Sequence, residues 1–284
     1  MSGRALRWAG CWIFVACSAT ASATVPVGVP LAVLEEGQWA LGFDYSYGEA
    51  DLQAYGFNNW TPTAGSPTST FELLDIDGLH SHTMLGSIAY GVCDTWDLFL
   101  RLGMTQSSDD VLAAGGERFA YDGGSGLAWG LGSRAMFCQY GPWTFGGLVQ
   151  VTWLDPGPSG FSWTDPGSPE TTTTGTISAD LWQTQASLAA TYQIDTLTLW
   201  AGPLLEFTKG SLDRSGRIIV DGNDTGSFRS EGHIEESSQF GVHFGFLWEK
   251  SDASSWWTSG QVTGSSWSVA VGAILRPERW FDRR

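Results

Sequence analysis

Residues 143–153, WTFGGLVQVTW, alternate between two kinds of side chain along their whole length. One set reads Trp, Phe, Gly, Val, Val, Trp, and the other reads Thr, Gly, Leu, Gln, Thr. Strict alternation predicts a β-strand, because successive side chains of a strand point to opposite faces. The apolar set begins and ends with tryptophan, a residue that prefers the level of lipid headgroups. The pattern therefore predicts a strand that crosses a bilayer with its apolar face toward lipid.

The length of this segment fits the same interpretation. Ten residue steps at about 3.3 Å each give roughly 33 Å. With a tilt of about 40°, such a strand spans roughly 25 Å, which is the height of the apolar band of an outer-membrane barrel.

The same alternation recurs along the chain, and it predicts ten strands. They cover residues 38–48, 83–93, 96–104, 127–138, 143–153, 182–192, 197–207, 235–249, 254–262 and 267–277. The connections alternate between long polar segments (51–79, 109–123, 156–177 and 211–232) and short ones (93–95, 140–142, 193–196 and 250–253). Long loops at one end and short periplasmic turns at the other are typical of an up-and-down β-barrel. The predicted fold class is thus all-β, an antiparallel transmembrane barrel of about ten strands, with eight to twelve possible.

Charged residues follow the predicted alternation. The inner phase carries six residues that we expect to form a lumen charge network: Asp44, Asp97, Arg101, Arg134, Glu206 and His243. The middle of the outer stripes carries no charge; one there would cost roughly 2–4 kcal/mol. The outer phase carries eight tryptophans that we expect to form an aromatic girdle: Trp39, Trp96, Trp129, Trp143, Trp153, Trp182, Trp248 and Trp267.

With these features the chain resembles small bacterial outer-membrane β-barrels of the broad OmpA/OmpW-like kind, over residues 38–276. The resemblance rests on architecture and implies a Gram-negative outer membrane. It also implies three partners: membrane lipid, lipopolysaccharide and the barrel-assembly machinery. Such barrels usually end on an aromatic residue, whereas here Trp280 and Phe281 precede Asp282-Arg283-Arg284. A soluble two-sheet β-sandwich is the alternative fold, since its strands also alternate.

The amino terminus has the pattern of a secretory signal peptide. Arg4 and Arg7 precede the apolar stretch 8–19, and Ala21-Ser22-Ala23 is a small-residue cleavage site. We therefore expect a signal peptide over 1–23, export through the Sec pathway, a short periplasmic segment over 24–37 and a C-terminal tail over 277–284.

Composition limits the partners further. The 284 residues include 37 Gly and 16 Trp, and the formal net charge is −16. Without Arg4 and Arg7 the mature chain has 12 basic and 30 acidic residues, a net charge of −18. So acidic a protein is not expected to bind nucleic acid.

Three functions remain open from the sequence. The first is a structural or surface-interaction barrel with a mostly plugged lumen, and the second is a narrow, porin-like channel for small solutes. The third is a hydrolase at the extracellular rim that acts on lipid or peptide. Its candidate residues would be Asp75, Asp77, His80, His82, His233 and Glu235. Because neither G-x-S-x-G nor an Asp-x-His motif is present, we expect no enzymatic activity, and no cofactor is indicated.

Two smaller features of the sequence concern calcium binding and disulfide formation. Asp221, Asn223 and Thr225 precede Gly226 like the first half of a calcium loop, but Gly232 occupies the position that requires Glu, and ordinary turn chemistry explains the segment equally well. Cys93 and Cys138 fall on the inner phase of the second and fourth strands. Two strand spacings are about 9.6 Å, so we predict two unbridged thiols.

Overall fold

The computed structural model describes residues 25–114, 117–164, 170–236 and 239–277. The predicted signal peptide and residues 278–284 lie outside this range. Every regular element in the described residues is a β-strand, and none of these residues belongs to a helix that is long and apolar enough to cross a bilayer.

The strands are long and antiparallel. In chain order they are β1 (Trp39–Pro62), β2 (Thr68–Cys93), β3 (Trp96–Ala114), β4 (Glu117–Asp122), β5 (Gly126–Tyr140), β6 (Trp143–Asp155), β7 (Ser159–Thr164), β8 (Thr171–Ile194), β9 (Leu197–Val220), β10 (Asn223–Glu236), β11 (Phe240–Ser251), β12 (Ser254–Thr263) and β13 (Ser266–Leu275).

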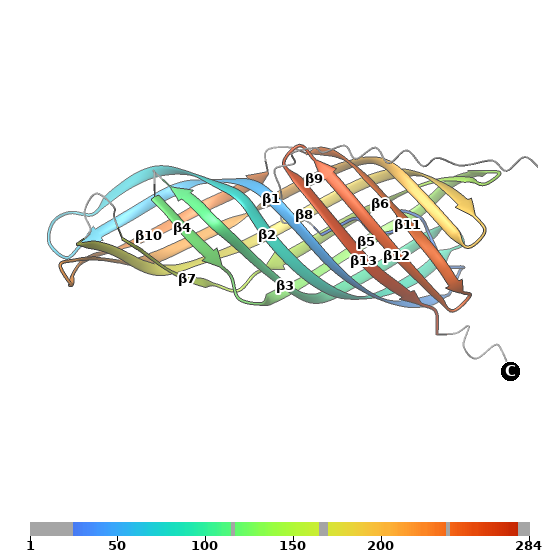
Figure 1. The fold of residues 1–284 in the computed structure, drawn as a ribbon, viewed down its shortest axis with the longest axis horizontal. Helices are drawn as coiled ribbons and strands as arrows, with labels where there is room; N and C mark the ends of the chain where they lie inside the picture. Colours follow the sequence, from blue (N-terminus) through green and yellow to red (C-terminus); the bar gives the residue numbers. More distant parts are fainter. Residues whose placement is uncertain (1–24, 115–116, 165–169, 237–238, 278–284) are drawn as a thin grey trace, which may run out of the picture.

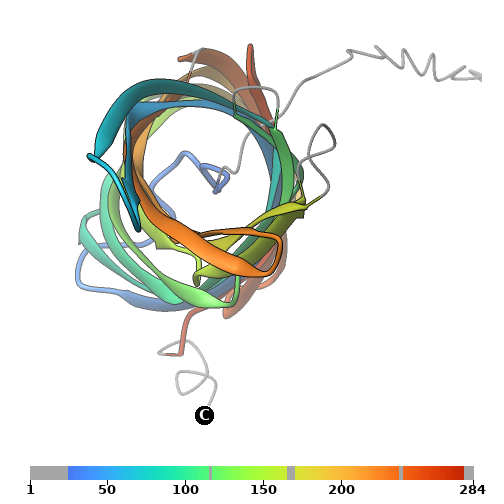
Figure 2. The ribbon, with the colours of Figure 1, turned by 90° about the vertical axis from the view of Figure 1, so that its left-hand side faces the viewer.

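Ten of these strands form a closed ring, in the order β1, β2, β3, β5, β6, β8, β9, β11, β12 and β13. The ring closes where β13 pairs with β1, from Leu41 opposite Leu275 to Ala50 opposite Ser266. Each of the ten predicted strands corresponds to one strand of this ring, so the prediction of an antiparallel ten-stranded barrel is confirmed. A two-sheet sandwich is excluded because the sheet closes on itself (Figures 1 and 2).

The two ends of the barrel differ. At one end, tight turns at 94–95, 141–142, 195–196 and 252–253 join consecutive strands. We call this the short-turn end, and the opposite end the extended end. At two of these turns one residue has a positive φ, Gly141 (59°) and Asp195 (51°), as is common in two-residue hairpin turns.

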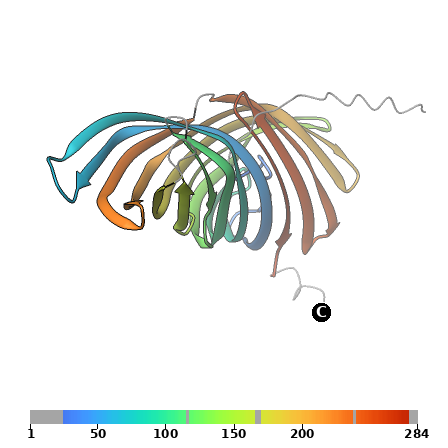
Figure 3. The same cartoon turned by 60° about the vertical axis from the view of Figure 1, so that its left-hand side comes forward.

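The long segments expected as polar loops are instead mostly strands. In the structure β1 and β2 together cover most of 51–79, β8 covers 171–177 and β9 covers 211–220. These four strands carry the wall well beyond the ten-stranded ring (Figures 1 and 3). The expectation was wrong because the inward positions of these segments are apolar. Leu52, Ile76, Ile177 and Leu212 form a buried cluster inside the extended end, which supports regular pairing there.

The wall of the extended end has a different composition from the ring. β10 ends at residue 236 and β11 begins at residue 240, and the two strands lie end to end along the same edge of β9. The β12–β13 turn ends partway up the wall, and β1 changes partner there, from Ala50 opposite Ser266 to Leu52 opposite Glu236. We call this junction the wall seam; the Asp51 N–H bridges it to the Ser265 carbonyl at 3.1 Å.

The interior of the barrel is filled. Buried apolar clusters occupy both halves of the lumen, and residues 25–34 run through the middle of the ring (Figure 2). Val25 is fully buried in the cluster of the extended end, and Val29 and Leu34 are buried in the cluster of the short-turn end. The expected periplasmic position of 24–37 therefore differs from the structure, which places 25–34 inside the barrel.

Candidate functional site in the lumen

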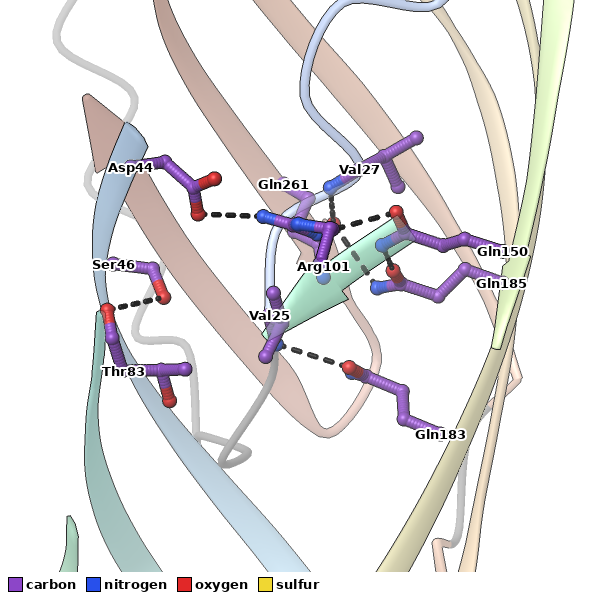
Figure 4. Close-up of polar contacts among 10 residues, drawn as sticks. All are labelled: Val25, Val27, Asp44, Ser46, Thr83, Arg101, Gln150, Gln183, Gln185 and Gln261. Atoms are coloured by element: carbon purple, nitrogen blue, oxygen red, sulfur yellow. Dashed lines mark hydrogen bonds and ion pairs between the residues drawn. The ribbon is translucent and has the colours of Figure 1, made fainter. Parts of the chain in front are cut away.

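The chain segment inside the lumen, Val25–Leu34, is named here the plug segment. Its main chain is held by side chains of the wall. The Val25 N–H donates to Gln183 Oε1 at 3.0 Å and the Val27 N–H to Gln261 Oε1 at 3.2 Å (Figure 4). Near the short-turn end, the Val33 N–H donates to Asp97 Oδ2 at 2.8 Å.

The sequence of the plug segment suits this position. Pro26 and Pro30 have no N–H, so they leave no main-chain donor to satisfy inside the lumen. Gly28 has a φ of +68°, a conformation that L-residues with a side chain rarely adopt, and it lies against the ring of Trp257. The valines between these residues pack on the wall.

A chain of polar side chains surrounds the plug segment at mid-height. Arg101 donates to Asp44 Oδ1 at 2.5 Å and to Gln150 Oε1 at 3.3 Å. Gln150 Nε2 donates to Gln185 Oε1 at 2.5 Å (Figure 4). Gln185 Nε2 in turn donates to Glu206 Oε2 at 2.7 Å.

This chain has a fixed direction, because its two ends differ in chemistry. A guanidinium only donates hydrogen bonds and an ionised carboxylate only accepts them. Arg101 therefore requires the oxygen of Gln150 to face it, and Glu206 requires the nitrogen of Gln185. The amide orientation of each glutamine between them follows from these two ends.

Glu206 also orients the two glutamines that hold the plug segment. Gln183 Nε2 donates to Glu206 Oε1 at 3.0 Å, and Gln261 Nε2 donates to Glu206 Oε2 at 2.8 Å. Their oxygens consequently point toward the N–H groups of Val25 and Val27. Glu206 is thus a positioning residue for the plug segment, acting through the glutamines.

All six residues expected in the lumen charge network are buried inside the barrel, but they do not form one network. Asp44 pairs with Arg101, and Arg134 pairs with Asp97 at 3.2 Å and lies 5.3 Å from the ring centroid of Phe99. His243 takes no part in an ion pair; its Nε2 lies 3.1 Å from the Leu188 carbonyl oxygen.

The glutamines are the site residues that sequence reasoning missed. Gln150, Gln183, Gln185 and Gln261 are each at most 2% exposed, and all four face the lumen. Their signal was present in the sequence, since four buried amides on the inner phase of three strands are costly unless they bond to one another.

Two cavities adjoin the plug segment. The one at the short-turn end is lined by Leu31, Val33 and Arg276 among others, and its volume is about 630 Å³. The one at mid-height is lined by Asp44, Arg101, Arg134 and Phe99 among others, and its volume is about 50 Å³. A water molecule takes up roughly 30 Å³ in the liquid, so this space holds one or two waters.

The eight girdle tryptophans lie on the outer surface at two levels. Trp39, Trp96, Trp143 and Trp248 lie near the short-turn end, and Trp129, Trp153, Trp182 and Trp267 lie at the other edge of the ring. Trp129, Trp153 and Trp182 contact one another, with ring centroids 5.7–6.4 Å apart. Exposed apolar side chains such as Leu100, Val149 and Val271 cover the wall between the two levels.

The candidate hydrolase residues do not form one site. His82 and His80 lie on the outer face of β2, where their Nδ1 atoms contact the hydroxyls of Tyr45 (2.7 Å) and Tyr47 (2.9 Å). His233 lies on β10 opposite Tyr55, which is eight residues further along β1 than Tyr47, or roughly 26 Å.

The acidic members of that set are equally dispersed. Glu235 pairs with Lys209 at 3.3 Å, and Gln53 donates to Asp75 at 3.2 Å. The side chain of Asp77 lies outside the described part of the chain.

The weak calcium-loop motif forms a hairpin turn. Asp221 and Gly222 have positive φ angles of 49° and 76° and connect β9 to β10. Asn223 Nδ2 donates to the Asp221 carbonyl at 3.2 Å, and Thr225 Oγ1 donates to the Ile218 carbonyl at 2.9 Å. These side chains serve the turn itself.

No protein-family model and no curated protein matches the sequence. Three solved structures illustrate the similarity. The outer membrane protease OmpT from Escherichia coli is 7% identical, with 83% of this chain and 94% of that chain covered and a TM-score of 0.37. The beta domain of the Bordetella autotransporter BrkA is 15% identical (86% and 100% covered, TM-score 0.38). A Pseudomonas aeruginosa FadL homologue is 10% identical (84% and 90% covered, TM-score 0.33). The fold assigned above therefore rests on the strand pairing of this chain itself.

Proposed function

We propose that this protein is a β-barrel of the Gram-negative outer membrane whose lumen is closed by its own plug segment. Its role in this proposal is structural or surface-interacting, with the extended end carried beyond the membrane. The apolar wall between two levels of tryptophan supports the membrane position, because such a wall would be unfavourable in water. The short-turn end would then face the periplasm.

The observation that carries the closed lumen is the attachment of the plug segment. Three main-chain N–H groups, from Val25, Val27 and Val33, are bound by buried wall side chains over the full height of the ring. At mid-height the space left beside the segment accommodates only one or two waters.

The proposal includes the partners expected from the sequence. Membrane lipid and lipopolysaccharide would contact the apolar wall and the tryptophan levels, and the barrel-assembly machinery would insert the chain. It includes no catalytic activity and no cofactor, since the candidate hydrolase residues are dispersed over the outer surface.

A narrow channel is the second candidate, and one observation favours it. The plug segment is bound through side chains and has no place in the sheet, so its departure would break no strand pairing. A channel would then exist only when the segment leaves the lumen.

Planar-bilayer conductance tests the proposal. We expect the mature protein to show no stable unitary openings, and a variant that lacks residues 25–34 to conduct. A variant in which these ten residues are replaced by Gly and Ser separates the effect of length from that of the contacts. Stable openings of the unmodified protein would contradict the closed lumen and support the channel.

A further inference from the structure

Two buried glutamates in the lumen lack a cationic partner. Other buried acids of the lumen are matched by arginines, Asp44 by Arg101 and Asp97 by Arg134. Within the described ranges, neither Glu206 nor Glu236 takes part in an ion pair, although the two residues are only 0% and 8% exposed. Because an uncompensated buried charge is strongly destabilising, these carboxyl groups require a proton or a cation.

The hydrogen bonds around Glu206 require it to be ionised. Three glutamines donate to its carboxylate through their Nε2 atoms: Gln183, Gln185 and Gln261. Their amide oxygens point elsewhere and accept from other groups, namely Gln150 and the N–H groups of Val25 and Val27 (Figure 4). A proton on Glu206 would find no acceptor among these neighbours, whereas a carboxylate accepts all three bonds.

Glu236 lies beside Glu206 on the inner face of the wall. The β9–β10 register brings it to Thr208, whose hydroxyl faces its carboxylate. Glu206 is two residues before Thr208 on the same face of β9, which makes it a diagonal neighbour of Glu236, roughly 7–8 Å away. From β12, Gln261 donates to Glu206 at 2.8 Å and Thr263 to Glu236 at 3.4 Å. The negative charges of the two carboxylates therefore repel each other.

Two oxygens in this cluster are left without a partner. Glu236 Oε1 accepts from the hydroxyl of Ser265 at 3.0 Å. Within the described part of the chain, Glu236 Oε2 and Thr208 Oγ1 form no hydrogen bond of regular geometry, although they face each other and Thr208 is only 3% exposed. Buried polar atoms are rarely left unpaired, so the pair indicates a bound group between them.

We propose that a calcium ion binds in the lumen between Glu206 and Glu236, with Thr208 as a third ligand. The available donors are carboxylate and hydroxyl oxygens, the ligands that calcium takes, and its flexible coordination accepts water for the remaining positions. Oxygens that share one calcium ion at about 2.4 Å each are held apart by it. This explains why the Thr208 hydroxyl faces Glu236 without bonding to it.

Charge distinguishes a calcium ion from a proton at this place. A proton on Glu236 would neutralise that residue alone and leave the ionised Glu206 uncompensated inside the lumen. A divalent cation balances both carboxylates at once. It also shields them from each other, which a proton on one of them achieves only by removing its charge.

The position of the ion gives it a role in the barrel wall. Glu236 ends β10 and Ser265 lies in the β12–β13 turn, so both belong to the wall seam, where β1 changes partner. An ion held by β9 and β10 would stabilise the wall where the strand ladder is interrupted. The site goes beyond the proposed function and does not depend on it, since a conducting barrel would hold the ion equally well.

The test uses the mature chain folded into detergent micelles without lipopolysaccharide, which itself binds divalent cations. Bound calcium is counted by elemental mass spectrometry, and melting temperatures are measured after addition of EDTA and again after addition of calcium chloride. Glu236→Gln removes one ligand charge. Glu235→Gln, on the outer face of the same strand, is the matched control.

We expect the unmodified protein and Glu235→Gln to hold about one calcium ion per chain and to lose several degrees of melting temperature in EDTA, which calcium restores, because a ligand that binds only the folded state stabilises it. Glu236→Gln should hold none and should respond to neither reagent. Thr208→Val keeps both carboxylates and serves where Glu236→Gln does not fold. It should bind calcium at least about tenfold more weakly.

Two results would overturn the inference. Unmodified protein without calcium, whose melting temperature ignores both reagents, would identify a proton as the neutralising group. Equal calcium binding by Glu236→Gln, or by Thr208→Val where that variant replaces it, would place the ion elsewhere. Planar-bilayer conductance is measured separately, so a barrel that stays closed but binds no calcium contradicts only the ion site.

Discussion

His243 Nε2 on β11 donates a hydrogen bond to the main-chain carbonyl of Leu188 on β8, across the intervening strand β9, at 3.1 Å. Because a carbonyl oxygen only accepts, the proton must be on Nε2. In the β8–β9 register Leu188 lies opposite Pro203, which has no N–H, and regular pairing is interrupted at Leu188 and Ala189. His243 itself lies opposite Gly202, whose missing side chain allows the ring to reach β8.

We predict that His243→Leu destabilises the barrel by about 1–3 kcal/mol, because the Leu188 carbonyl loses its donor inside the wall. His243→Gln, which retains an N–H donor, should recover part of the loss. Urea-induced unfolding in lipid vesicles measures both. Equal stability of the Leu variant and the unmodified protein would show that the carbonyl has another donor.

The role of His243 illustrates where sequence reasoning succeeds and where it stops. Alternation placed His243 in the lumen correctly, because the inner phase is a property of one strand. Its partner depends on a gap between Pro203 and Leu188, and the gap becomes visible only when the register of two strands is known. The same limit applies to Gln183 and Gln261, which are recognisable as inward-facing but not as the acceptors for the plug segment.

The plug segment and the extended end were missed for different reasons. Val25–Leu34 contains two prolines and no polar residue, so no alternation of apolar and polar positions marked it as a strand, and its position follows from contacts with distant residues. The extended hairpins were predicted as loops because polar outer positions, such as Gln53 and Asp75, hid the apolar inner positions beside them.

The conformation of Gly28 gives a test of the plug segment. Gly28→Ala should cost roughly 1–2 kcal/mol, since the φ of +68° is unfavourable for alanine, while Trp257 at 3.7 Å leaves room for the added methyl group. We expect the strain to loosen the segment and to produce transient openings in a planar bilayer.

Gly37→Ala provides the matched control for this variant. Its φ is +79° and no atom lies within 4 Å of the added methyl group, but it follows the plug segment. It should cost similar stability without openings. Openings in both variants, or in neither, would contradict the assignment of Gly28 to the closure of the lumen.

Val149 tests the position of the membrane. Its side chain is 55% exposed on the outer face of β6, midway between Trp143 and Trp153. Val149→Arg should impair assembly, because an arginine at the bilayer midplane costs about 2–4 kcal/mol. Thr176→Arg, on the outer face of β8 in the extended end, should assemble normally. Heat-modifiable migration on a gel reports folding of both, and equal defects would place the apolar band wrongly.

Asp180 gives a prediction for pH dependence. It lies two residues beyond Trp182 toward the extended end, and burial, followed by the charges of Asp155 and Asp213, raises its pKa above the ordinary value of 3.8. The folded protein therefore holds this proton more tightly than the unfolded chain does. Its contribution to stability is fully present below about pH 3.8 and is lost as the pH rises through the raised pKa.

Asp180→Asn should accordingly be slightly more stable than the unmodified protein at pH 8 and equally stable at pH 3, because the amide keeps the neutral state at both. The effect should be small, since the side chain is solvent-exposed and screened by salt. Urea unfolding at the two pH values measures it. A larger gain at pH 3 than at pH 8 would reverse the sign and contradict the argument.

Cys93 and Cys138 are free in the structure, as predicted, but Cys138 faces elsewhere than expected. Alternation placed both on the inner phase; a β-bulge between Met136 and Cys138 changes the register, and Cys138 is exposed at the short-turn end. Cys93 is half-buried, with its Sγ 3.5 Å from the hydroxyl of Thr95, and β3 lies between the two cysteine strands.

We predict that the folded protein takes up a thiol reagent first at Cys138, and that unfolded, unreduced protein takes up two labels. Cys93→Ser and Cys138→Ser should each take up one. Unfolded protein that takes up no label without reductant would mean that a disulfide joins the second and fourth ring strands across β3.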